Sequence, residues 1–182
     1  LNLTMGPVEV GRLEQEILRA GPEVEVFGIG RHLELMKQVG HPDVLDRQFN
    51  IAAMDGTHFI GHTRLSTESK VDISHSQPFW THGVTDLAVV HNGHITNYDR
   101  IRRLYEQKGV RFFSENDSEV IGIYLAEQLE QGRTLEKALA KSLADCDGSV
   151  TYIVPTAERI GSARDPSACK QTISAERPAQ RA

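Results

Sequence analysis

The sequence is poor in the features that mark several common protein classes. Its only cysteines, Cys146 and Cys169, lack C-x-x-C spacing, which argues against a disulfide framework or a thiolate metal site and favours a reducing compartment. It has no apolar run of the ~18 residues that span a bilayer, and its start lacks a signal-peptide pattern. A formal net charge of -5 offers no basic face for nucleic acid or anionic membrane. We therefore expect a cytoplasmic protein that binds neither.

The composition is that of one folded domain. The chain has 182 residues, of which 39% are hydrophobic and 25% charged, and no repeat or linker divides it. Residues 167–182 contain little apolar material and no periodicity. We assign residues 1–170 to a domain and residues 171–182 to a polar tail.

Apolar periodicity predicts a mixture of helices and strands. We expect helices over residues 7–20, 31–40, 97–108, 116–129 and 134–143, and strands over 24–29, 57–63, 86–90, 149–154 and 160–163. The strand at 86–90 is almost continuously apolar, which predicts a central position in a sheet. Asn116 and Glu119 have the spacing of a capping box. Because strands and helices do not alternate regularly, the order predicts an α+β fold.

Two weaker patterns suggest cofactors. Gly28-Ile29-Gly30 follows an expected strand like a dinucleotide loop, but Leu33 stands where a third glycine is needed. Five histidines crowd the middle of the chain without the spacing of a known metal signature: His62, His75, His82, His91 and His94. A nucleotide- or metal-binding module is therefore the least favoured interpretation, and we expect no cofactor and no metal.

Three polar segments, each next to an apolar run, carry the strongest signal. They are GHTRLST at 61–67, His-Asn-Gly at 91–93 and Asn-Asp-Ser-Glu at 116–119. The planar fork of Arg64 suits a carboxylate, although a lone arginine after a strand is usually structural. Asn-Gly is the commonest hairpin turn signal, and equally a carboxamide and a glycine N–H that can form an oxyanion hole. Asp117 follows the Asn116 cap, where the helix dipole favours negative charge.

At these segments the sequence resembles the class II glutamine amidotransferases, an N-terminal-nucleophile family. The resemblance implies an αββα sandwich that hydrolyses the side-chain amide of glutamine to glutamate and ammonia, without a metal. It implies that Arg64 binds the α-carboxylate of glutamine and Asp117 the α-ammonium, with Thr67 along the side chain. Asn92 and Gly93 would then form the oxyanion hole.

The nucleophile of that family is a cysteine at the first position, whose own α-amine is the base, and position 1 here is Leu1. An internal cysteine such as Cys146 or Cys169 has no free α-amine. We therefore expect a sandwich incomplete at both ends and a chain that is inactive as given. The alternative is a degenerate module that binds glutamine or a partner without catalysis.

Residues 24–34 and the Asn-Asp-Ser-Glu variant are most similar to stand-alone amidotransferase subunits of glutamate-synthase-like enzymes. That resemblance implies a partner synthase that receives the ammonia. It leaves the ammonia acceptor open.

Overall fold

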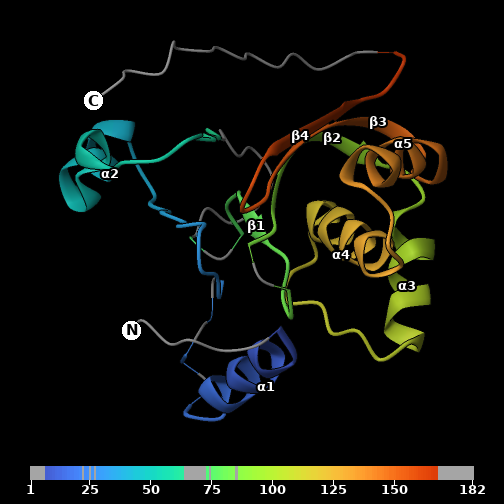
Figure 1. Cartoon of the computed structure of the whole chain (residues 1–182), viewed down its shortest axis with the longest axis horizontal. Helices are drawn as coiled ribbons and strands as arrows, with labels where there is room; N and C mark the ends of the chain where they lie inside the picture. The colour runs from blue at the N-terminus through green and yellow to red at the C-terminus, as the bar shows by residue number, and fades with distance from the viewer. Residues whose placement is uncertain are drawn as a thin grey trace.

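The computed structural model describes residues 7–21, 23–24, 26, 28–63, 73, 75–84 and 86–167. Its elements, in chain order (Figure 1), are α1 (Pro7–Leu18), α2 (Pro42–Phe49), the 3-10 helix η1 (Ile51–Ala53), β1 (Phe79–Trp80), β2 (Ala88–Ile95), α3 (Tyr98–Gln107), α4 (Asp117–Glu130), α5 (Leu135–Asp145), β3 (Gly148–Pro155) and β4 (Ile160–Arg164). Helices and antiparallel strands are mixed, so the predicted α+β class is confirmed. No helix in these ranges is both long and apolar enough to cross a membrane.

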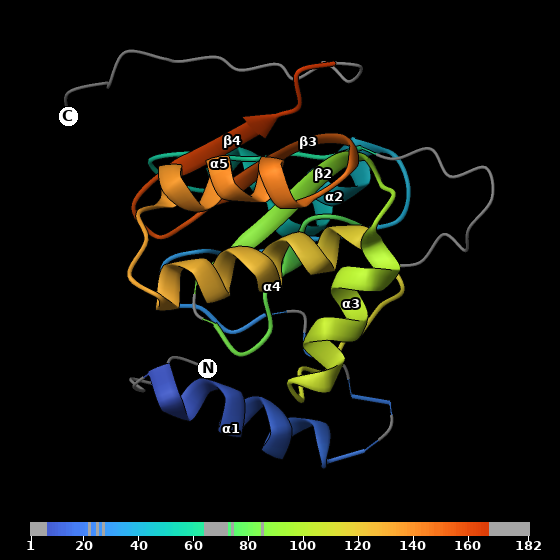
Figure 2. The same cartoon turned by 90° about the vertical axis from the view of Figure 1, so that its right-hand side faces the viewer.

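The four strands form one antiparallel sheet in the order β1-β2-β3-β4. Strand β2 lies between two others, as its apolar run predicts. Helices α4 and α5 cover one face of the sheet, with α3 beside α4, and α2 lies on the other side (Figure 2). The second sheet implied by the family resemblance is not among the described elements and stays a prediction.

The hydrophobic core fills the space between the sheet and α4 and α5. Side chains alternate along a strand, so one set of β2 and β3 residues faces these helices. Val89, Val150 and Val154 belong to that set and are almost fully buried, and they pack in one cluster with Leu125 of α4. On the other face of β2, Ala88 and Val90 are also buried, whereas Asn92 and His94 are exposed. The exposed part of that face is therefore the end of β2 that carries Asn92.

The start of α4 differs from the capping box predicted for it. Asn116 is the cap, since its side-chain oxygen accepts the Ser118 N–H at 2.9 Å. Glu119 does not reach back to the cap; its carboxylate accepts the N–H groups of Phe113 and Ser114 at 2.7 and 2.8 Å. The Asn116 N–H instead donates to the Ser114 hydroxyl. Glu119 therefore fixes the loop before α4, which the spacing alone did not reveal.

Two strands and one helix predicted in the first third of the chain are wrong. The described residues of 24–29 and all of 57–63 lie outside any strand, and 31–40 is not helical. The apolar spacing of residues 57–63 predicted a strand wrongly, because these residues are not packed in a sheet: the Phe59 side chain is 60% exposed. The predicted helix over 7–20 is confirmed by α1, and the helices predicted from residue 97 onward and the strands over 149–154 and 160–163 are confirmed within a few residues.

The Gly-Ile-Gly segment packs against Trp80 instead of opening a helix. A Cβ on Gly28 or Gly30 would lie within 2.5 Å of the Trp80 ring, so the backbone rests directly on the indole. The N–H groups of residues 31–33 then converge on one carboxylate oxygen of Asp86, at 2.9, 2.8 and 2.9 Å. These amides, which a nucleotide phosphate would need, bind an internal carboxylate.

Candidate functional site

Asn92 and Gly93 lie inside strand β2 and not in a turn, so the hairpin interpretation is wrong. Asn92 pairs with Thr151 of β3, and Gly93 with Val150. A side chain at Gly93 is impossible without rearrangement, because its Cβ would lie 1.9 Å from the carbonyl oxygen of Ser149. Glycine is required here by the close approach of β3.

One edge of β2 presents a row of backbone N–H groups toward the side of β1. In an antiparallel ladder, alternate residues direct their N–H groups to the same side. Gln77 accepts the His91 N–H and Asp117 accepts the Ile95 N–H, so Gly93, between them, directs its N–H to that side too. Beyond the β2–β3 ladder, no residue that the structure describes accepts it. Among the described residues, this N–H is therefore available to a further acceptor.

Asp117, the first residue of α4, sits beside this edge. Its carboxylate accepts the Ile95 N–H at 3.0 Å and lies 3.4 Å from Nδ1 of His91. Burial alone would raise the pKa of Asp117, but the hydrogen bond and charge of His91 and the Ile95 N–H outweigh burial, so the pKa lies below its usual value. An ionised carboxylate is therefore held next to the strand that carries Gly93.

Asn92 projects from the opposite face of the strand from His91, because neighbouring side chains alternate. It is exposed, and its carboxamide makes no side-chain hydrogen bond within the part of the chain that the structure describes. Asp117 therefore contacts the β2 edge that carries His91 and Gly93. The Asn92 side chain, on the other face of the strand, takes no part in these contacts.

Two residues at this edge were missed by sequence reasoning. His91 is buried, with Nδ1 3.4 Å from both Asp117 and the Ser118 hydroxyl, and its Nε2 has no partner among the described atoms. Gln77 binds both backbone groups of His91. Sequence analysis placed His91 in the His-Asn-Gly segment and among five crowded histidines but assigned it no role, and no pattern singles out Gln77.

Arg64 and Thr67 lie outside the described residues. The segment before them lines a hollow of about 480 Å³ together with residues 75–78 and the start of α2. Gly61, His62 and Thr63 form one wall, and Gln77 is part of another. The chain that leads into Arg64 therefore shares a hollow with the residue that binds the His91 backbone.

Cys146 is buried, as its position at the end of an amphipathic helix predicts. Burial, with the nearby charges of Asp145 and Asp147, raises the pKa of its thiol to about 11. The neutral thiol is a poor nucleophile. Cys169 lies outside the described residues, and within them no three side chains of His, Cys, Asp or Glu gather as a metal site would require.

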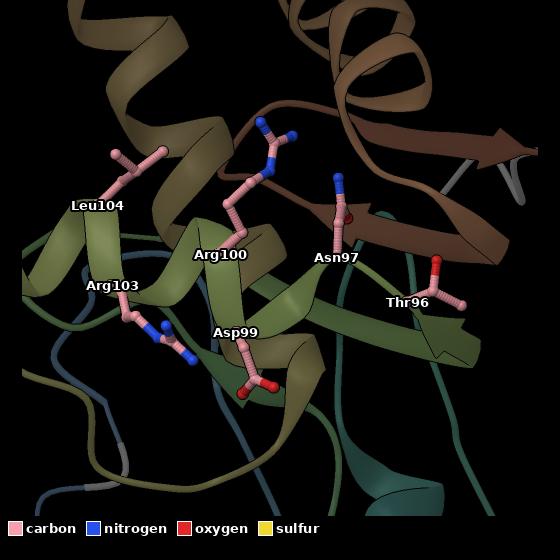
Figure 3. A pocket seen from close by; sticks show the side chains of 6 residues that line it. All are labelled: Thr96, Asn97, Asp99, Arg100, Arg103 and Leu104. Atoms are coloured by element: carbon pink, nitrogen blue, oxygen red, sulfur yellow. The ribbon is translucent and has the colours of Figure 1, made fainter.

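A separate hollow of about 400 Å³ lies at the start of α3 and contains none of the predicted site residues. Figure 3 shows that Arg100 and Arg103 point away from each other around it. Asn97 is already engaged by the backbone at Asp145 and Asp147. This hollow lacks the convergent polar groups of a ligand site.

Residues 62–180 match the family described as glutamine amidotransferase domain. The chain belongs to that family. The match spans all three polar segments from His62 onward, so the resemblance to class II amidotransferases is confirmed. The relatives of this glutamine amidotransferase domain include proteins named as glutamine amidotransferases and proteins named as aminotransferases.

Two relatives illustrate that range. The chain is 39% identical over 155 residues to the glutamine amidotransferase-like protein GlxB of Rhizobium meliloti (strain 1021), covering 85% of this chain and 51% of GlxB. It is 32% identical over 120 residues to a glutamine–fructose-6-phosphate aminotransferase of Bradyrhizobium diazoefficiens, covering 66% of this chain and 19% of that enzyme. The chain thus spans about half the length of GlxB.

A solved structure supports the fold of the glutamine amidotransferase domain. The structure titled as the allosteric regulatory enzyme of purine biosynthesis superposes with a TM-score of 0.57. The alignment covers 67% of this chain and 27% of that chain at 23% identity. At this identity the likeness concerns the fold alone.

Proposed function

We propose that this domain binds L-glutamine and forms the glutaminase site that supplies ammonia to a synthase partner. The observation that carries the proposal is the β2 edge, where the ionised Asp117 accepts the Ile95 N–H two residues from the Gly93 N–H. A carboxylate suits the α-ammonium of an amino acid, and a backbone N–H suits an oxygen on which negative charge develops.

We assign the remaining contact with the charged groups of glutamine to Arg64. Its guanidinium would bind the α-carboxylate, and Thr67 would lie along the side chain. The hollow shared by residues 61–63 and Gln77 supports a position of this loop close to the β2 edge. A site that binds both charges of a zwitterion selects an α-amino acid better than either charge alone.

The proposed reaction begins when a cysteine thiolate attacks the side-chain amide carbon of glutamine. The Gly93 N–H and the Asn92 carboxamide would donate to the amide oxygen as it gains negative charge. The α-amine of the cysteine takes the thiol proton and passes it to the leaving ammonia, and water then releases glutamate from the thioester. A partner must receive the ammonia before water protonates it.

Neither cysteine of the 182 residues suits this role. Cys146 is buried with a raised pKa, and an internal residue such as Cys169 has no free α-amine. We therefore expect the 182-residue chain to bind glutamine without releasing glutamate. The alternative, a module that binds glutamine and never hydrolyses it, is separated by adding an N-terminal cysteine segment and measuring glutamate release.

The binding test is calorimetric titration with L-glutamine of the chain and of Asp117→Asn. Asparagine keeps an oxygen for the Ile95 N–H but removes the charge. The affinity should fall by about 2–5 kcal/mol, because the ammonium loses its counter-charge in a partly buried site. Asp99→Asn, in the exposed first turn of α3, is the matched control and should bind as the unaltered chain does. No glutamine binding by the unaltered chain, or equal binding by Asp117→Asn, would refute the proposal.

A further inference from the structure

Strand β1 stops two residues short of the point where it would meet His91. Phe79 pairs with Val89 and Trp80 with Ala88. Continuing this antiparallel register places Gln77 opposite His91.

The Gln77 side chain takes the place of the missing strand backbone. Its oxygen accepts the His91 N–H at 2.5 Å, and its nitrogen donates to the His91 carbonyl at 2.8 Å. These two bonds are those that a paired strand residue would make. The same nitrogen lies 3.5 Å from the Ser118 hydroxyl of α4.

Because the pairing is made by a side chain, it ends at His91. A backbone strand continuing past Gln77 would meet Gly93 next and cover its N–H. The carboxamide holds the strand while leaving the next donor open. It also holds His91, whose ring lies 3.4 Å from both Asp117 and Ser118.

We propose that Gln77 is a positioning residue of the glutamine site. Its carboxamide fixes the β2 edge so that the Gly93 N–H stays uncovered, and through His91 and Ser118 it fixes the carboxylate of Asp117. This inference rests on the proposed function, because the groups that it aligns are those assigned to glutamine.

The experiment compares Gln77→Met with the unaltered chain. Methionine keeps the length of the side chain and removes both hydrogen bonds. The dissociation constant for L-glutamine should rise on the order of tenfold to hundredfold, since a displacement of ~1 Å in a binding group has effects of this size. Gln107→Met, at an exposed glutamine of α3 that lines none of the hollows described above, is the matched control and should leave binding unchanged.

Two further measurements separate positioning from a general effect on folding. The titrations are run well below the unfolding midpoint of each variant, where a purely structural role of Gln77 would leave the dissociation constant unchanged. In the double variant Gln77→Met/Asp117→Asn, the loss of affinity should be smaller than the product of the two single losses, because both act on one carboxylate. Independent, multiplicative losses would overturn the proposal.

Gln77→Glu keeps the test decisive if Gln77→Met does not fold. Glutamate retains an acceptor for the His91 N–H but places a like charge near Asp117 and loses the donor to the His91 carbonyl. It should weaken glutamine binding and move the pH dependence of binding toward higher pH.

If the unaltered chain binds glutamine and either folded variant binds it equally well, the role of Gln77 is refuted while the proposed function stands. If the unaltered chain does not bind glutamine, the proposed function fails and this inference fails with it.

Discussion

The two ends of the described chain are built on different principles. Among the described residues, every buried hydrophobic side chain lies between Phe79 and Ala163. Among the described residues of 12–63, the one buried side chain is the carboxylate of Glu14. Helix α2 buries no residue at all. We call these the core unit (79–165) and the polar region (12–63).

The polar region is attached to the core unit by carboxylate hydrogen bonds and by the contact of Gly28 and Gly30 with the Trp80 ring. Glu14 of α1 binds His82 and the Gly83 N–H. Asp86 accepts three N–H groups of residues 31–33. Carboxylate contacts of this kind depend on ionisation, whereas apolar burial does not. Removing a carboxylate charge at this junction should therefore open the attachment locally while the core unit stays folded.

This division runs through the proposed glutamine site. Gly93 and Asp117 belong to the core unit and are held there by the sheet and α4. Arg64 and Thr67 follow directly on the polar region. The groups proposed for the ammonium and the oxyanion, Asp117 and Gly93, are thus already positioned by the core unit.

The largest effect is expected from truncation in the core unit. Leu125 of α4 is fully buried, so Leu125→Ala should lower the free energy of unfolding by about 2–5 kcal/mol through lost burial and a cavity. Urea unfolding followed by far-UV circular dichroism measures it. Leu104→Ala, at a leucine that is 51% exposed on α3, should change the free energy by less than about 0.5 kcal/mol. Similar losses of unfolding free energy in Leu125→Ala and Leu104→Ala would contradict the assignment of Leu125 to the core and Leu104 to the surface.

A smaller and local effect is expected at the junction of the two regions. Asp86→Asn keeps an oxygen for the N–H groups of residues 31–33 and tolerates the positive φ of 55° at this position, but it removes the charge. Charge-assisted hydrogen bonds are about twice as strong as neutral ones, so local opening should become easier by about 1–2 kcal/mol.

Amide hydrogen exchange checks this prediction residue by residue. The amides of residues 31–33 should exchange faster in Asp86→Asn, while those of Val89 and Leu125 keep their protection. Asp55→Asn, at an exposed aspartate, is the control. Equally faster amide exchange in the polar region and in the core unit would mean that the two regions unfold as one.

The same distinction explains how much of the fold the sequence predicts. Periodicity located α1 and, in the core unit, α3, α4, α5, β3 and β4, where apolar faces are buried against another element. It failed over residues 24–40 and 57–63, where conformation is set by Asp86 and by contact of glycines with Trp80. Such contacts join residues more than fifty positions apart and leave no local pattern.

The site shows a similar limit. The motifs predicted Asn92, Gly93 and Asp117 by resemblance, and the structure brings Gly93 and Asp117 to one edge of β2. The roles of Arg64 and Thr67 stay predictions. Gln77 could not be found from the sequence, because its function depends on the register of β1 against β2 and on a side chain replacing a backbone.

The smallest expected effect concerns Asp117, a polar contact inside the core unit. Its pKa is lower in the folded chain than the usual 3.8, because the stabilisation by His91 and the Ile95 N–H exceeds the cost of burial. The stability that this difference contributes is fully present well above the unfolded pKa and is lost as the pH falls through the folded pKa. The slope of unfolding free energy against pH, measured by urea unfolding from about pH 6 down to about pH 3, should therefore be shallower in Asp117→Asn by a fraction of one proton. Asp99→Asn serves as the exposed control. An unchanged slope in Asp117→Asn would mean that the ionised Asp117 is no better stabilised in the folded chain than in the unfolded chain. The carboxylate would then not be a preassembled part of the proposed site.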